Sequence, residues 1–198
     1  MQPQPYKCLE DQADASFTNL CFVCVKYGTK YGADYVNKLY WGVKKYCTLE
    51  HQFVCFTEDS EGLDSEIEVK PLKNKWSGWW SKVHIFDKES YPKESTRVFY
   101  IDLDMIISGN LNDLAKLKVK RFATLSTDDI FCENVQGGYN SSIMIFNSEA
   151  MDIIYQTLVK YYDNLLKYLM RFDHFLEMMV WDATLVQVAL PRQVLDYM

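Results

Sequence analysis

The chain has 198 residues, of which 48% are hydrophobic, 24% charged and 15% aromatic, and its formal net charge is −6. This balance excludes a wholly disordered chain, and the length predicts one domain that buries a core without disulfide or metal crosslinks. An acidic chain without a block of Lys or Arg also lacks the usual electrostatic signature of nucleic-acid binding or of binding to anionic membranes.

The cysteines and the polar start of the chain bear on its compartment. No segment has the pattern of a signal peptide or is apolar for long enough to span a membrane. Cys21 and Cys24 would point to opposite faces of a strand, which predicts buried thiols rather than a shared metal or redox centre. Unpaired thiols are typical of reducing compartments, so we expect a soluble cytoplasmic protein with a loose polar leader over residues 1–19.

The first part of the chain alternates strand and helix patterns. Leu20–Val25 is a continuous apolar run, typical of a strand that is buried on both faces. Apolar residues at three- and four-residue spacing predict a helix over 33–47. Gln52–Phe56 predicts a second strand, and Ile67–Val69 predicts a third that Pro71 would end. This order predicts βαβ units and a mostly parallel sheet.

The later part contains further strands and two longer helices. An aromatic cluster, Trp76–Lys82, leads into a short helix. Buried strands are predicted at Arg97–Ile101, Arg121–Leu125 and Ser142–Phe146. Ser148 is expected to cap a helix whose apolar face reaches Leu169, and a final helix is expected over about 174–189, before Pro191. The whole pattern predicts an α/β fold, with a mostly parallel central sheet flanked by helices.

Two aspartates follow the most apolar of these strands. Because residues i and i+2 of an extended segment point the same way, Asp102 and Asp104 are expected to present both carboxylates to one point. That point lies at the carboxyl end of a strand, where open α/β sheets bind their ligands. Two converging carboxylates repel each other unless a cation lies between them, and Mn²⁺ or Mg²⁺ suits oxygen ligands. We therefore predict a divalent metal site on Asp102 and Asp104.

Two enzyme classes use such a pair. In a phosphatase of the haloacid dehalogenase type, the first aspartate attacks phosphate and the second is the acid, and the segment Ile101–Ile106 has a compatible hydrophobic frame. Those enzymes usually open their core domain with this strand, whereas here a strand, a helix and two further segments precede it. In a nucleotide-sugar glycosyltransferase, the pair holds Mn²⁺ against a diphosphate, and a nucleotide-binding βαβ half comes first.

Four stretches resemble the small glycosyltransferases of the glycosyltransferase-A fold, particularly the family that includes glycogenin and bacterial lipo-oligosaccharide galactosyltransferases. They occur in the family's order, at 22–28 with 35–40, at 78–82, at 98–104 and at 138–144. Similar domains occur in bacteria and in large viruses of algae. The resemblance implies one Rossmann-like catalytic domain over residues 20–198. It would transfer a hexose from a nucleoside diphosphate sugar, UDP-linked, to a glycan or other hydroxyl acceptor, with Mn²⁺ or Mg²⁺ and with retention of anomeric configuration.

The resemblance also implies roles for individual residues. The donor would contact three groups of them: Val25, Lys26, Tyr27 and Tyr31 at the base and ribose, Lys82 near the diphosphate, and Asn140, Ser141 and Ser142 in a turn beneath the sugar. Leu103, between the two aspartates, is also expected to contact the donor. Asp128 and Asp182 would be the catalytic carboxylates, both near the donor sugar. Trp79 or Trp80 would stack on the sugar or the acceptor. Each type has a plainer alternative, namely an exposed lysine, an ordinary turn asparagine and buried tryptophans.

The sequence departs from the family pattern in two places. The family's Gly-Asp-Gln-Asp segment corresponds to Trp181–Thr184, where Ala183 replaces the glutamine near the anomeric carbon. The chain also ends at Met198, without the His-Gly-x-Lys-Pro-Trp segment that carries the family's third metal ligand, so the catalytic domain is expected to be truncated at its C-terminus. These departures leave a third possibility open, a sugar-nucleotide- or glycan-binding domain without turnover. No oligomeric state is predicted.

Overall fold

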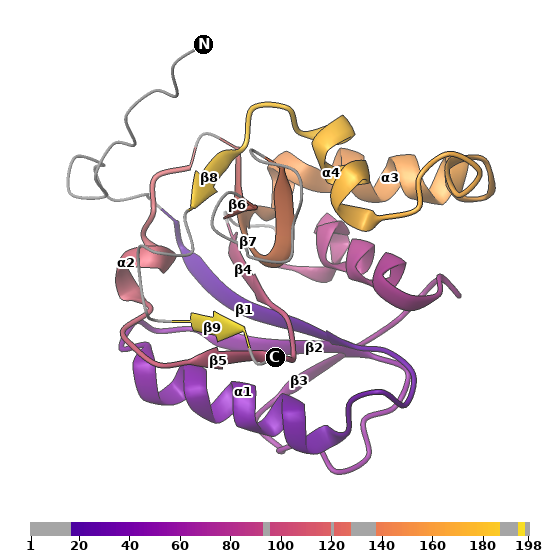
Figure 1. Ribbon diagram of the computed structural model, residues 1–198. Helices are drawn as coiled ribbons and strands as arrows, with labels where there is room; N and C mark the ends of the chain where they lie inside the picture. Colours follow the sequence, from indigo (N-terminus) through magenta and orange to yellow (C-terminus); the bar gives the residue numbers. More distant parts are fainter. Residues whose placement is uncertain (1–16, 93–95, 120, 128–137, 187–193, 197–198) are drawn as a thin grey trace.

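A seven-stranded sheet forms the centre of the computed structural model, which describes residues 17–92, 96–119, 121–127, 138–186 and 194–196 (Figure 1). Its strands lie in the order β3 (Glu68–Pro71), β2 (Gln52–Thr57), β1 (Asn19–Lys26), β4 (Thr96–Ile101), β7 (Tyr139–Asn147), β6 (Phe122–Ser126) and β8 (Thr184–Val186). Strand β7 is antiparallel to both of its neighbours, and every other pair in the sheet is parallel. The predicted α/β class with a mostly parallel sheet is confirmed.

Helices cover the two faces of this sheet. Helix α1 (Ala33–Tyr46) packs on one face through the apolar positions that its spacing predicts. The opposite face is covered by a 3₁₀ helix (Gly78–Phe86), by α3 (Ser148–Leu165) and by α4 (Phe172–Met179). The face of α1 also carries the short helix α2 (Asn112–Ala115).

The alternation of side chains along β1 divides the core into two layers. Phe22 and Cys24 are buried on the α1 side, whereas Cys21 and Val23 are buried on the α3 side. The expectation that Cys21 and Cys24 face opposite ways is therefore confirmed. Burial raises the pKa of the Cys21 thiol, as expected for an inert core cysteine.

The structure corrects several predicted boundaries towards the end of the chain. Helix α3 starts after an Asn147 cap and ends at Leu165, so Ser148 is not the cap and the helix does not reach Leu169. The final helix predicted over about 174–189 exists but is shorter, because α4 ends at Met179 and β8 follows it. A short apolar run fits a strand or a helix equally well, and here its pairing with β6 selects the strand.

The sequence patterns also missed a second, two-stranded sheet. It consists of β5 (Met105–Ile107) and β9 (Val194–Asp196), which pair antiparallel. Strand β5 follows Asp104 directly, and its Met105 and Ile107 join the core on the α1 side. The pairing of β5 and the burial of its side chains therefore fix the position of the segment immediately after the two aspartates.

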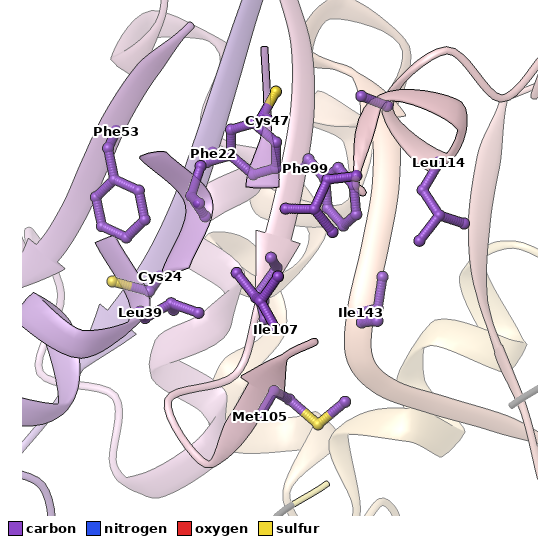
Figure 2. Close-up of a cluster of buried hydrophobic side chains, with 14 of the residues drawn as sticks. Phe22, Cys24, Leu39, Cys47, Phe53, Phe99, Met105, Ile107, Leu114 and Ile143 are labelled. Carbon is purple, nitrogen blue, oxygen red and sulfur yellow. The ribbon is translucent and has the colours of Figure 1, made fainter. Parts of the chain in front are cut away.

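The centre of the α1-side core gives a test of the fold. Phe99 of β4 is fully buried and stacks on Phe22 of β1, with ring centroids 5.0 Å apart (Figure 2). We expect Phe99→Ala to lower the free energy of unfolding by about 3–5 kcal/mol, because it removes a large side chain from a packed site. Urea denaturation measures this loss. As a control, Tyr168→Ala removes an aromatic ring that is 84% exposed and should change stability by only about 0.5 kcal/mol; similar losses in both variants would contradict this packing.

Candidate functional site

A cavity of about 510 Å³ opens at the carboxyl ends of the neighbouring parallel strands β1 and β4. It is lined by the loop 27–31 after β1, by the start of the 3₁₀ helix and by the end of β4. Ligands of open α/β sheets bind at this kind of position, because the loops that follow neighbouring strands meet there. Both Asp102 and Asp104 line this cavity.

The two aspartates converge for a different reason from the one expected. The segment is not extended, since the amide N–H of Met105 donates to the carbonyl of Asp102 at 3.2 Å and closes a turn. The amide N–H of Asp102 itself donates to the carbonyl of Ser142 at 2.9 Å and continues the pairing of β4 with β7. A turn anchored on the neighbouring strand therefore places both carboxylates on the cavity wall.

Asp102 is engaged by two donors. The ammonium of Lys82 lies 2.7 Å from Oδ2 of Asp102, and the hydroxyl of Tyr100 donates to Oδ1. The side chains of Lys82 and Asp102 are only 16% and 19% exposed, so water screens this ion pair less than it screens a surface pair. Burial, together with the charge of Asp102, raises the pKa of Tyr100 well above its usual range and keeps its hydroxyl a donor.

Asp104 has a separate partner in the loop after β1. The hydroxyl of Tyr31 donates to Oδ2 of Asp104 at 2.7 Å. The ammonium of Lys30 lies 4.6 Å from the centre of the Tyr31 ring, and its hydrogen bond to the Tyr31 hydroxyl raises the pKa of Lys30. The cavity therefore holds two carboxylates and two ammonium groups, which suits a ligand that carries both a cation and anionic phosphates.

The carboxylates of Asp102 and Asp104 fit the ligands that a protein would contribute to a divalent-cation site. Asp102 and Asp104 supply hard oxygen ligands on one wall, as Mn²⁺ or Mg²⁺ prefers. Among the described residues there is no group of three or more His, Cys, Asp and Glu side chains that could hold a metal ion. A cation here would take its remaining oxygens from water and from a bound diphosphate.

The two tryptophans of the 3₁₀ helix point in different directions, Trp79 to the cavity and Trp80 to the core. Side chains three residues apart eclipse each other in a 3₁₀ helix, so Trp79 and Lys82 both line the cavity. For the same reason Trp80 and Val83 both face the core, where Trp80 is buried. Trp79 is 58% exposed and lines the cavity rim.

Two glycines shape the loops at the rim. Gly28 and Gly78 both line the cavity with positive φ angles of 64° and 59°. A Cβ at either position would meet no atom within 4 Å, so the constraint is the backbone conformation rather than space. These glycines allow the chain to turn sharply where it leaves β1 and where it enters the 3₁₀ helix.

The structure brings together most of the residues expected to contact a donor. Besides the two aspartates, the cavity wall contains Val25, Tyr27, Tyr31, Trp79, Lys82 and Leu103. Lys26 does not belong to this group, because its ammonium turns to the other side and binds Asp59, 3.2 Å from Oδ2 and 3.1 Å from the carbonyl oxygen. The role expected for Lys26 at the base and ribose does not fit this orientation.

The segment Asn140–Ser142 lies inside β7 and does not form the predicted turn. Oδ1 of Asn140 accepts from the amide N–H of Ser142 at 3.0 Å, so this side chain is used locally. Ser141 approaches the cavity more closely, because its hydroxyl oxygen accepts from the ammonium of Lys82 at 3.4 Å. Of these three residues, Ser141 is the one whose side chain contacts the ion pair in the described structure.

Of the two carboxylates expected near the donor sugar, the structure describes one. Asp182 lies between α4 and β8, in a segment that is anchored on Tyr139 through the carbonyl of Val180 and the amide of Ala183. It is not among the residues that line the cavity. Asp128 lies outside the described residues.

Helix α4 supplies two carboxylates that the sequence patterns missed. Oδ1 of Asp173 accepts from the amide N–H of Ser141, and Oε1 of Glu177 accepts from that of Tyr139, both at 2.9 Å. A register shift between Thr124 and Leu125 interrupts the pairing of β6 with β7 beside these amides. The acidic pair at i and i+4 was the available signal, but the predicted helix began one residue after Asp173.

The fold is that of known glycosyltransferases. The chain is similar to the glycosyltransferase GlyE of Streptococcus pneumoniae TIGR4, with a TM-score of 0.62 and 15% identity over 86% of this chain and 45% of that chain. It is also similar to the galactosyltransferase LgtC in a complex with donor and acceptor sugar analogues, with a TM-score of 0.57 and 12% identity over 80% of this chain and 70% of that chain. This chain thus spans less than half of the length of GlyE. No protein-family model and no curated protein sequence matches it.

The contact between Asp173 and Ser141 can be tested directly. We expect Asp173→Ala to lower the free energy of unfolding by about 1–3 kcal/mol, because it leaves a buried amide N–H without an acceptor. Asp173→Asn keeps an acceptor oxygen and should lose less. Hydrogen exchange, measured at the Ser141 amide by NMR, should become faster in the alanine variant. Unchanged protection of that amide would show that Asp173 does not hold β7 in place.

Proposed function

We propose that this chain belongs to a glycosyltransferase that moves a hexose from a nucleoside diphosphate sugar, UDP-linked, to an acceptor hydroxyl. The observation that carries the proposal is the cavity at the ends of β1 and β4, where Asp102 and Asp104 lie beside the ammonium groups of Lys82 and Lys30. Its position in a fold shared with glycosyltransferases supports a donor site of this kind.

Each wall of the cavity suits one part of such a donor. Lys82 and Lys30 would bind the diphosphate oxygens through charge-assisted hydrogen bonds. The exposed rings of Tyr27 and Trp79 would stack on the base or the sugar. A divalent cation held by Asp102 and Asp104 would supply positive charge where the leaving diphosphate develops negative charge. The family resemblance further supports retention of anomeric configuration.

A second function, donor binding without turnover, is favoured by one observation. Among the described residues, Asp102 and Asp104 are the only carboxylates that line the cavity. If both hold a cation, neither can serve as base for the acceptor or as nucleophile. Ala183 at the family's glutamine position supports the same alternative. Turnover distinguishes the two functions.

The activity predicts how an aspartate variant behaves. We expect the chain to release UDP from a UDP-hexose in the presence of Mn²⁺, and Asp104→Asn to slow this release by at least about 100-fold, because the variant loses a negative charge that holds the cation at the leaving diphosphate. A coupled assay for UDP over a panel of UDP-hexoses measures it. Asp34→Asn, on the exposed side of α1, is the matched control.

Three outcomes separate the candidate functions. Near-normal UDP release by a folded Asp104→Asn variant contradicts the role of the aspartate pair. Calorimetric binding of UDP without release from any donor favours the binding domain. Neither binding nor release would refute both proposals.

The ion pair between Lys82 and Asp102 predicts that metal and nucleotide bind cooperatively. Without nucleotide, a cation must displace Lys82 from Asp102, whereas a diphosphate would attract Lys82 and also supply oxygen ligands. We expect saturating UDP to tighten Mn²⁺ binding by about 5–150-fold, with the same factor for the effect of Mn²⁺ on UDP. Paired calorimetric titrations measure both factors.

A variant of Lys82 separates its effect on metal binding from its effect on nucleotide binding. Lys82→Ala should bind Mn²⁺ alone more tightly than the unsubstituted chain, because Asp102 is released. It should bind UDP more weakly by about 1.5–3 kcal/mol, because a charge-assisted hydrogen bond is lost. Lys38→Ala, which removes an ammonium 75% exposed on α1, is the control. If UDP leaves the affinity for Mn²⁺ unchanged, the protein alone builds the cation site and the coupling is wrong.

A further inference from the structure

In the connection between α3 and α4, large apolar side chains are exposed to an unusually high degree. Met170 and Tyr168 are 85% and 84% exposed, the highest values for large hydrophobic residues in the described part of the chain. Tyr161 in the last turns of α3 and Leu166 directly after the helix are also exposed, at 44% and 38%. Figure 1 shows this connection at the far end of the two helices, away from the central sheet. We call residues 159–171 the α3–α4 tip.

The same tip concentrates positive charge on an acidic protein. Lys160, Lys167 and Arg171 are exposed there, and Asp163 is the one acidic residue between 159 and 171. The tip therefore carries +3 − 1 = +2, and the rest of the chain carries −6 − 2 = −8. Charge of this sign is local to the tip, so the composition of the whole chain conceals it.

The side chains of the tip have the chemistry of a membrane interface. Tyrosine places an apolar ring and a polar hydroxyl at the level of lipid headgroups, and an unbranched Met inserts between acyl chains. Lys and Arg extend their ammonium and guanidinium groups to lipid phosphates while their stems cover apolar surface. Lys167 and Lys160 have exposed partners without charge, the amide oxygen of Asn164 and the ring of Tyr161. Arg171 forms a longer ion pair with Asp173, at 3.7 Å, while its own side chain is 46% exposed.

We propose that the α3–α4 tip docks on the surface of an anionic phospholipid bilayer. The contact would be peripheral, because no helix of the described chain is long and apolar enough to cross a membrane. Charge complementarity selects an anionic bilayer over a neutral one. The remaining net charge of −8 would be repelled from the same surface, which orients the molecule with the tip towards the lipid. The composition-based exclusion of anionic membranes thus holds for the chain as an average and not for this tip.

The tip is also connected to the candidate donor site. Two residues after Arg171, Asp173 accepts from the amide of Ser141, and the Ser141 hydroxyl contacts Lys82. A tip held at a bilayer would therefore be connected through Asp173 and Ser141 to the wall of the cavity, which suits acceptors that are anchored in that bilayer. This last point depends on the proposed glycosyltransferase function, whereas the docking itself does not.

Vesicle flotation of the complete 198-residue chain tests the docking. We expect the chain to float with vesicles of mixed phosphatidylcholine and phosphatidylglycerol and not with vesicles of phosphatidylcholine alone, and raised salt should weaken the binding. The double variants Tyr168→Ser/Met170→Ser and Lys160→Glu/Lys167→Glu should each bind at least about tenfold more weakly. The variant Trp41→Ser/Lys45→Glu makes the same kinds of change on the exposed side of α1 and should bind normally.

Several results would overturn the proposal. One is that the chain does not float with anionic vesicles. Another is that the tip variants float as the unsubstituted chain does, while circular dichroism shows that these variants are folded. A second copy of the chain could cover the tip instead; light scattering would then show a dimer that the tip variants dissociate, without vesicle binding. None of these measurements depends on sugar transfer, so the docking and the proposed activity can fail independently.

Discussion

The ion pair between Lys82 and Asp102 joins the three elements that form the candidate site. Lys82 comes from the 3₁₀ helix, Asp102 follows β4, and Ser141 of β7 contacts the same ammonium. Because both charged side chains are largely buried, either one alone would be left with a desolvated charge. The helix and the strand ends must therefore meet in this arrangement. In the proposed donor site, a ligand with phosphate groups would offer Lys82 another partner and release Asp102.

The reversed strand β7 is the element on which this arrangement depends. On one side, the carbonyl of Ser142 in β7 accepts a hydrogen bond from the amide N–H of Asp102. The amide N–H groups of Tyr139 and Ser141 in β7 donate to the carboxylates of Glu177 and Asp173 in α4. The interrupted pairing with β6 would otherwise leave buried donors unsatisfied. Helix α4 thus completes the hydrogen bonding of the sheet, and in doing so it links the cavity to the α3–α4 tip.

Charge in this protein acts locally. The net charge of −6 describes neither the cavity, which holds ammonium groups beside carboxylates, nor the tip, which is positive. Electrostatic interactions fall off within about 8–10 Å at physiological salt, so a ligand responds to the charges near its own site. Arguments from composition exclude partners that need an extended surface of one sign, and they do not exclude partners that need a small one.

The sequence by itself determined the elements with strong patterns and the location of the site. The apolar runs of β1 and β4 and the periodicity of α1 predicted their positions to within one or two residues, and the placement of Asp102 and Asp104 after β4 predicted the cavity edge. Lys26 could also have been placed, because it follows Val25 in a strand and must point the opposite way. Only the tertiary structure decided that Thr184–Val186 is a strand, because its partner β6 lies about 60 residues away in the chain. It also decided that Asp173 supports Ser141, because a contact between residues 32 positions apart depends on distance in space. The cations of the tip lie within one short segment of the sequence, and only the structure decided that this segment is exposed.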